Sequence, residues 1–549
     1  MSPTRIALKR TLVGRRMPLS ELEGELLPKR LALPIFASDP LSSVAYATEA
    51  GLLVLITASL ASRSLIVPIS LVITALLAIV VLSYRQTIFA YPNGGGSYVV
   101  AKENLGALPG LVAAASLLTD YVLTVAVSVA SGVLAVTSAV PELASHAVAI
   151  SLAVLVLLVL VNLRGVRESG YAFALPTYAF IGSVGALIIV GLVRGLVSGW
   201  PTAHVPDAAP VGLAGSVGLI VVLRAFASGC SALTGVEAIS NGVPAFRRPQ
   251  AVNASRTLMV MGGIAIASFM GVSVLAWKID ARPSGSVSGL SEIARAVFPP
   301  GDSSFGYYLV QASTAAVLAL AANTAFQGFP RLSALLASDS YLPRQFANLG
   351  DRLVFSNGIV VLAVAAAALI IGFGADVNSL IHLYLLGVFT AFTLSQFGMV
   401  RRSFTLRGQP NAPGWGAVAL NGSGGLLTGL VGVIVLVTKF TEGAWMVTIA
   451  IPTLVLGFAL VNRHYRDVSS RLQVPAGIPL PRVAARGPIV LYVDELDDAT
   501  AEAVRFVRSV AGDRFQAVQV SAASGIAGAW KAFSGTSAPL VVLPQSGTV

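Results

Sequence analysis

Charged residues and cysteine are both scarce in this sequence. Of 549 residues, 11% are Asp, Glu, Lys or Arg and 55% are apolar, and the mean hydropathy is +0.81. Soluble domains carry roughly 25% charged residues, so the deficit predicts that lipid surrounds most of the chain. The single cysteine, Cys230, excludes a disulfide framework, and the 4 histidines have no spacing typical of a transition-metal site.

The N-terminal segment lacks the apolar core of a cleavable signal peptide. Residues 1–30 instead contain several Arg and Lys residues. The net charge of +11 does not indicate nucleic-acid binding, because the basic residues lie between apolar segments, where they orient a membrane protein.

Long apolar runs recur along the chain up to about residue 465, and each is long enough to cross roughly 30 Å of hydrocarbon. They predict an all-α polytopic membrane protein with about twelve transmembrane helices. The predicted spans are 31–58, 64–84, 108–136, 147–163, 170–193, 213–240, 257–277, 305–327, 357–373, 378–399, 415–438 and 443–462. The run at 357–373 is marginal in length.

Arg and Lys are unevenly distributed between the two sets of alternating loops. With twelve spans, the N-terminal tail and one set of loops contain about 20 of these residues, and the other set contains about 6. Because positively charged loops stay in the cytoplasm, we expect both termini there and a multi-pass protein of the cytoplasmic (inner) membrane.

The composition changes near residue 466, where prolines mark a linker. We expect a cytoplasmic tail at 1–30, a transmembrane transport domain at 31–465, a linker at 466–487 and a cytoplasmic α/β domain at 488–549. In that domain, strands are expected at 488–493, 515–521 and 540–543, and helices at 498–510 and 525–533. About 60 residues form only a marginal independent core, and the segment contains no phosphate loop.

Two of the predicted spans contain helix breakers beside a carboxylate. In the first span Pro40 follows Asp39, and in the sixth Gly229 and Gly235 precede Glu237. Spans one and six are five apart, so these positions predict a transporter with a 5+5 inverted repeat and broken helices 1 and 6. A pair of ordinary packing kinks is the alternative.

A third carboxylate, Asp120, lies in the third span. Thr124 and Ser128 follow it at i+4 and i+8, so three oxygen-bearing side chains share one helix face. A charge at mid-membrane depth costs at least about 2.5 kcal/mol and usually marks a route for an ion or a proton. Hard oxygen ligands favour alkali and alkaline-earth cations over transition metals. These residues therefore predict a cation site inside the bundle.

Five stretches carry a joint resemblance to known proteins. They are ASDPLSSVAYATE (37–49), YPNGGGSYVVAKENLG (91–106), LLTDYVLTVAVSVASG (117–132), SGCSALTGVEAISNGVPAF (228–246) and LYLLGVFTAFTLSQ (383–396). Together they are similar to KimA-type potassium importers of the amino acid–polyamine–organocation (APC) superfamily. The resemblance covers nearly the whole membrane part. It implies the LeuT-like fold of this superfamily, with ten core helices in two inverted repeats plus two more.

The resemblance also implies a function and a site. It implies a secondary transporter, not an enzyme, that imports potassium by proton symport with alternating access and needs no cofactor. The implied potassium ligands are Asp39, Tyr46, Asp120, Tyr121, Thr124, Ser128, Thr234 and Tyr384. Glu237 matches the acidic position that is associated with proton coupling. A homodimer held partly by the cytoplasmic domains, and inhibition by cyclic di-AMP, are implied as well.

Five of the implied hydroxyl ligands have a structural alternative. Tyr46 and Tyr121 can serve as hydrogen-bonding groups within the bundle, and Tyr384 as a packing residue. Thr124 and Ser128 can bond to backbone carbonyls of their own helix. Asp39 and Asp120 are the hardest to explain without a cation.

Two further charged residues suggest an outer gate. Glu49 lies ten residues after Asp39, and Arg224 lies ten residues before Thr234, so each is about 15 Å from its break at 1.5 Å per residue. We predict that Glu49 and Arg224 form an ion pair when the site faces inward. The alternative is that both side chains extend separately to the membrane interface.

Three other functions are alternatives to potassium import. An amino acid permease on the same fold typically binds its substrate's carboxylate at a Gly-rich break, whereas here Ser38, Asp39 and Pro40 place a fixed anion there. A membrane-embedded enzyme such as a phosphotransferase needs clustered Asp or His at the membrane surface. A structural or sensory membrane protein does not need buried carboxylates in three spans.

Overall fold

The computed structural model describes residues 28–94, 96–164, 170–203, 218–283, 287–299, 304–350, 354–409, 412–472, 489–520 and 526–543. Most of the predicted tail (1–30) and most of the predicted linker (466–487) lie outside the described residues. The chain divides into two compact units, Met1–Val468 and Ser469–Val549, which are described separately here.

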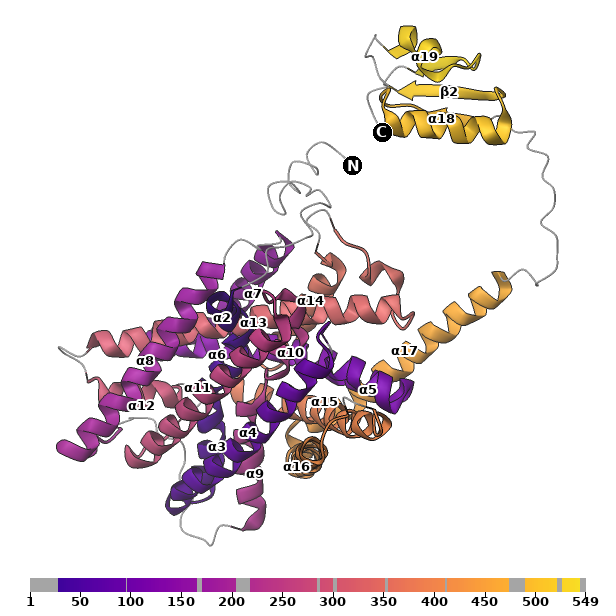
Figure 1. Cartoon of the computed structure of the whole chain (residues 1–549). Helices are drawn as coiled ribbons and strands as arrows, with labels where there is room; N and C mark the ends of the chain where they lie inside the picture. Colours follow the sequence, from indigo (N-terminus) through magenta and orange to yellow (C-terminus); the bar gives the residue numbers. More distant parts are fainter. Residues whose placement is uncertain are drawn as a thin grey trace. The chain divides into compact units, whose positions relative to one another are not determined.

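Helices account for nearly all of the described residues of the first unit (Figure 1), because a backbone in lipid must satisfy its own polar groups. Their bounds are α2 (Lys29–Ser42), α3 (Val44–Ala58), α4 (Ile66–Ala90), α5 (Ser97–Leu105), α6 (Ala107–Ala139), α7 (Ala147–Leu163), α8 (Gly170–Val197), α9 (Leu219–Gly229), α10 (Glu237–Asn241), α11 (Gln250–Lys278), α12 (Gly289–Val297), α13 (Ser304–Ser338), α14 (Ser356–Gly372), α15 (Val377–Thr405), α16 (Trp415–Lys439) and α17 (Ala444–Leu472). Short 3-10 helices join some of them, among them η2 (Leu60–Leu65), η4 (Cys230–Leu233) and η7 (Phe440–Glu442).

Eleven spans within the described residues are long and apolar enough to cross a membrane. The helix at the predicted marginal span, α14, is also apolar but has only 17 residues. At 1.5 Å per residue it is about 26 Å long, slightly less than the hydrocarbon thickness. The polytopic all-α prediction is confirmed, with eleven full-length spans and this shorter helix.

Helices that are distant in sequence pack closely in the first unit. Helix α3 packs against α9, α4 against α11, and α6 against α13 and α15, while α15 also packs against α16. Small residues permit some of these approaches: a methyl group on Gly387 of α15 would lie 3.0 Å from the carbonyl oxygen of Ser116 in α6. The buried core therefore brings α3, α6, α9 and α15 together.

The first and sixth spans are each divided into shorter helices. The first consists of α2 and α3, with Ser43 between them and Pro40 inside the last turn of α2. The sixth consists of α9, η4 and α10, with Thr234, Gly235 and Val236 between the last two. The inverted repeat stays a prediction.

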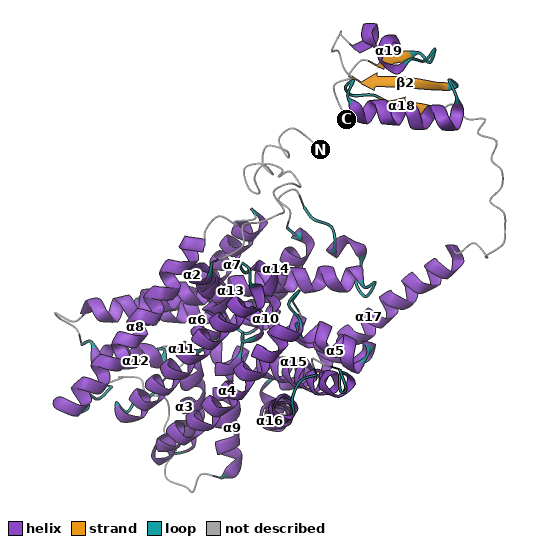
Figure 2. Cartoon of the chain, in the orientation of Figure 1, coloured by secondary structure: helices purple, strands orange, loops and turns teal. Residues whose placement is uncertain are grey.

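The second unit contains the three described strands (Figure 2). Strands β1 (Ile489–Tyr492), β2 (Phe515–Val520) and β3 (Leu540–Leu543) form a parallel sheet in that order, with helices α18 (Asp498–Ala511) and α19 (Ile526–Ser534) in the connections. Its core includes Phe515 and Trp530, and the Trp530 indole N–H donates to the carbonyl of Ala538 at 2.9 Å. The predicted small α/β unit is confirmed.

Candidate functional site

Four hydroxyl groups meet where the two divided spans cross α15. Ser43 Oγ lies 3.0 Å from Tyr46 Oη and 2.8 Å from Thr234 Oγ1, and Tyr46 Oη lies 3.1 Å from Tyr384 Oη. All four residues are buried. The structure thus brings three of the predicted ligands, Tyr46, Thr234 and Tyr384, into one hydroxyl cluster. Ser43 joins them although the sequence did not single it out.

The two divided spans also touch at Asp39. Gly235 has a φ of +76°, which favours glycine, and a methyl group there would lie 2.6 Å from Asp39 Oδ2 and 2.8 Å from Pro40 Cδ. The carboxylate therefore rests against the backbone of the sixth span. Any larger residue at position 235 would displace it.

Three carboxyl groups are buried next to this contact. Asp39, Asp120 and Glu237 are 6%, 3% and 3% exposed, and electrostatic interactions link Asp39 with Glu237 and Asp120 with both. One oxygen of each, Asp39 Oδ1, Asp120 Oδ1 and Glu237 Oε2, is buried without a hydrogen-bond partner. None of the three forms an ion pair with a Lys or Arg of the described residues.

Negative charge is thus gathered without a resident counter-charge, an arrangement suited to a cation that comes and goes. The described residues include no group of three or more His, Cys, Asp and Glu side chains placed to hold a metal ion. Any cation here would therefore depend on hydroxyl and carbonyl oxygens as well as carboxylates, as the hard ligand set of an alkali ion allows.

Asp120, Thr124 and Ser128 are all buried along α6. Thr119 of the same helix bonds back to the carbonyl of Ala115 at 2.8 Å, which is the behaviour considered as an alternative for Thr124 and Ser128. In the described part of the chain neither Thr124 nor Ser128 forms such a bond. Their hydroxyls therefore remain available to a ligand.

Tyr121 occupies a different place from the hydroxyl cluster. Its Oη accepts a hydrogen bond from Asn241 Nδ2 at 3.2 Å, and its ring lines a cavity of about 150 Å³ together with Phe36, Asn241 and Gln327. A methyl group on Gly328 would lie 2.6 Å from Tyr121 Cζ, so the ring packs tightly against α13. The tyrosine thus forms part of the wall of this cavity.

The predicted ion pair between Glu49 and Arg224 is not formed in this structure. The two residues lie at one level, since a methyl group on Gly51 would be 3.2 Å from the carbonyl oxygen of Ala225. Their side chains nevertheless leave α3 and α9 in different directions. Glu49 Oε2 accepts from the N–H of Gly289 at 2.8 Å, and Arg224 Nη1 is 3.6 Å from Glu442 Oε1.

The sequence of this chain is similar to those of known membrane transporters. A family profile described as "Amino acid permease" matches residues 35–461, which is most of the chain. The chain belongs to the amino acid permease family. This permease is also similar to the potassium transporter KimA of Bacillus subtilis (strain 168). The two are 42% identical over 520 residues, which cover 94% of this permease and 83% of the relative.

The match confirms the resemblance to KimA-type transporters and, with it, that this permease is a transporter rather than an enzyme. Sequence reasoning missed Ser43 and Asn241 at the site. A signal for Ser43 exists, because Ser42 and Ser43 directly follow the Asp39–Pro40 breaker, where hydroxyls can satisfy freed backbone groups. Both serines donate to the carbonyl of Asp39, at 2.8 and 3.1 Å. Asn241 offers no comparable signal.

Proposed function

We propose that this permease imports potassium ions across the cytoplasmic (inner) membrane by proton symport. The observation that carries the proposal is the group of buried carboxyl groups, Asp39, Asp120 and Glu237, none of which has a basic partner in the described chain. The similarity to a protein named as a potassium transporter supports the same substrate.

The potassium ligands would come from two sources. Asp39 and Asp120 supply negative charge, while the hydroxyls of Tyr46, Thr234 and Tyr384 replace part of the ion's hydration shell. Thr124 and Ser128 extend the same set along α6, and Ser43 is an additional candidate because its Oγ joins the cluster. Tyr121 acts at the wall of the cavity, where it meets the ion as the ion leaves.

Glu237 is the proposed proton carrier. A membrane potential of 100 mV supplies about 2.3 kcal/mol per charge, which supports roughly a 40-fold potassium gradient. A co-transported proton adds a second charge and any pH gradient. Glu237→Gln should leave potassium movement that no longer responds to an imposed pH gradient, and uptake by this variant that stays fully proton-coupled would reject the assignment.

The distribution of Arg and Lys supports a topology with both termini in the cytoplasm. In that topology the cavity beside Tyr121 opens toward the cytoplasm, because Gly94 and Gly96 of its lining belong to the loop between α4 and α5 on that side. The site then faces inward here, and the segment from the end of α3 to η2 lies at the outer end. Alternating access would rock the α3 and α9 helices against the rest of the bundle.

The domain arrangement predicted from the sequence, with a cytoplasmic α/β domain after a linker, is kept as part of this proposal. A homodimer joined by that domain and inhibition by cyclic di-AMP likewise remain proposals that rest on the family resemblance.

An amino acid permease is the second candidate, because the family profile carries that description. The fixed carboxylate of Asp39 at the first break argues against it, since it would repel a substrate carboxylate.

The deciding experiment is growth of a bacterium that lacks its own potassium importers in low-potassium medium, with uptake of labelled amino acids measured in the same cells. We expect the wild-type permease to restore growth without raising amino acid uptake. Amino acid accumulation without rescue would reject potassium import in favour of the second candidate.

A further inference from the structure

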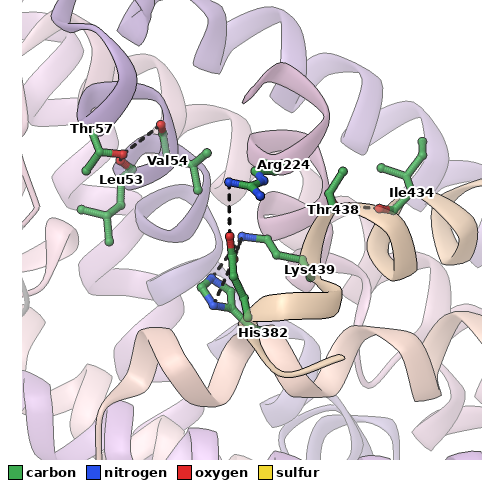
Figure 3. A network of polar contacts seen from close by, with 9 residues as sticks. Leu53, Val54, Thr57, Arg224, His382, Ile434, Thr438 and Lys439 are labelled. Atoms are coloured by element: carbon green, nitrogen blue, oxygen red, sulfur yellow. Dashed lines mark hydrogen bonds and ion pairs between the residues drawn. The ribbon is translucent and has the colours of Figure 1, made fainter. Parts of the chain in front are cut away.

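A network of basic and acidic side chains lies at the end of the bundle where α3 ends (Figure 3). Lys439 Nζ donates to Glu442 Oε2 at 2.8 Å and lies 3.1 Å from His382 Nε2. His382 Nδ1 is 3.3 Å from the same Glu442 oxygen, while Glu442 Oε1 is 3.6 Å from Arg224 Nη1. Figure 3 shows the Arg224 guanidinium pointing toward the place where the His382 and Lys439 side chains meet.

Lys439 anchors this network, because its side chain is only 1% exposed and a buried ammonium needs a partner. An ammonium group can only donate, so His382 Nε2 must accept and the ring proton sits on Nδ1, facing Glu442. The carboxylate of Glu442 is thus held on one side by Lys439 of α16 and His382 of α15. Glu442 itself lies in η7, which directly follows α16, and α15 and α16 pack against each other.

Arg224 reaches the carboxylate from the other side. It belongs to α9, which packs against α3 and also against α16, and its side chain is 41% exposed. This ion pair therefore links the sixth span to the α15–α16 pair. Of the contacts that Glu442 makes, it is the one that connects the carboxylate to a divided span.

We propose that Glu442, held by Lys439 and His382, is the outer latch that receives Arg224 when the site faces inward. Opening the outer end moves α9 away and breaks the contact between Arg224 and Glu442. Lys439 and His382 stay with the carboxylate, so opening leaves no buried charge without a partner. Arg224 meanwhile gains water at a position that is already partly exposed. The contact can therefore break and form again without leaving a buried charge unpaired.

Ser228 supplies a reporter for the latch. It lies one helical turn after Arg224 on the same face of α9, and it is fully buried with no partner for its Oγ. A cysteine at this position would be shielded from the outside while the latch is closed. The natural cysteine, Cys230, is buried and is replaced by alanine in the background for the experiment.

The test measures labelling of Cys230→Ala/Ser228→Cys in intact cells by a membrane-impermeant thiol reagent. Arg224→Gln should raise the labelling rate by about two- to fivefold, the range expected for a partly exposed ion pair. Arg224→Lys should stay near the background rate because it keeps the charge. Arg63→Gln is the matched control, since Arg63 of η2 pairs with Asp280, just after α11, whereas Glu442 pairs with Arg224, His382 and Lys439.

Equal labelling with Arg224 and with Arg224→Gln would overturn the proposal, as would an equal rise in the Arg63→Gln control. Unfolded and permeable-reagent-treated samples establish that the cysteine is present and reactive in every variant. Arg224→Gln leaves the pair between Lys439 and Glu442 intact, so the result does not depend on a variant that removes the buried lysine's partner. Labelling needs no potassium flux, so it is independent of the proposed substrate.

Discussion

Two sets of charged side chains in this permease are compensated in opposite ways. Asp39, Asp120 and Glu237 lie near the helix breaks with one unpartnered oxygen each and no basic side chain paired to them in the described residues. Glu442, by contrast, is contacted by His382, Lys439 and Arg224. Buried charge persists only when something pairs with it. The first set therefore suits a transported cation, and the second is complete with its own residues.

The largest expected effect tests whether the carboxylates without a basic partner are needed for potassium uptake. Asp39→Asn or Asp120→Asn should each lower the initial rate of potassium uptake by roughly 30-fold or more, since losing a buried charge partner costs about 2–5 kcal/mol. The measurement is potassium uptake at matched expression in cells that lack other importers.

Asp376→Asn is the control for this experiment. Asp376 Oδ2 accepts from the N–H of Ser379 at 3.0 Å to cap α15, and asparagine caps a helix equally well. Near-normal uptake by Asp39→Asn would show that potassium does not bind at the proposed site.

The compensated set should respond in stability rather than in substrate binding. Glu442→Gln replaces the carboxylate that neutralises the buried Lys439 with an uncharged amide, so we expect a loss of about 2 kcal/mol in the free energy of unfolding. Thermal unfolding of the purified protein measures this loss as a lower unfolding temperature. Adding Lys439→Met to Glu442→Gln should recover part of it, and an unchanged unfolding temperature in Glu442→Gln would show that the pair is not needed.

Potassium itself should distinguish the two sets. At ten times its dissociation constant, a ligand that binds only the folded state stabilises it by about 1.4 kcal/mol. Potassium chloride should therefore raise the unfolding temperature of the wild type and of Arg224→Gln, but not of Asp39→Asn. Choline chloride at the same ionic strength is the control. An equal response of Asp39→Asn to potassium would place the ion elsewhere.

Glu292 is an intermediate case and should show the smallest effect. Burial raises its pKa to about 7, while the N–H of Arg282, at 2.7 Å, and the charges of Arg295 and Arg282 lower it. Folded Glu292 holds its proton more tightly than the unfolded chain does, so its stabilisation is complete below about pH 4.5 and is lost as the pH rises through about 7. Glu292→Gln should flatten the fall in unfolding temperature between about pH 5 and pH 8, by roughly 2 °C. Parallel pH profiles of the two proteins would contradict this.

Much of the fold follows from local pattern. The apolar runs predict the membrane-spanning helices, because a helix in lipid satisfies its own backbone polar groups whatever its neighbours are. Helix α14 shows where this reasoning is weakest. The run at 357–373 is as apolar as the other spans, but its 17-residue helix is shorter than a full membrane span. The three strands near 489, 515 and 540 were also predicted, from β-branched runs between turn residues.

The candidate site was only partly predictable. A carboxylate beside a helix breaker is a functional-site hypothesis by itself, which is why the sequence singled out Asp39 and Glu237. Tyr121 was grouped with the other hydroxyls through family resemblance. In the structure its ring lines the cavity, and its hydroxyl accepts a hydrogen bond from Asn241. The sequence does not show which way two adjacent residues of α6 point relative to helices far along the chain.

The predicted gate residues, Glu49 and Arg224, show most clearly what sequence determines and what tertiary structure determines. Sequence by itself determined that Glu49 and Arg224 share a level, because depth along a helix is a count of residues from the break. Only the tertiary structure decided that Glu49 turns to Gly289 and Arg224 to Glu442. Depth depends on one helix alone, whereas the partner of a charged side chain depends on how that helix is rotated against its neighbours, and packing between distant segments sets that rotation.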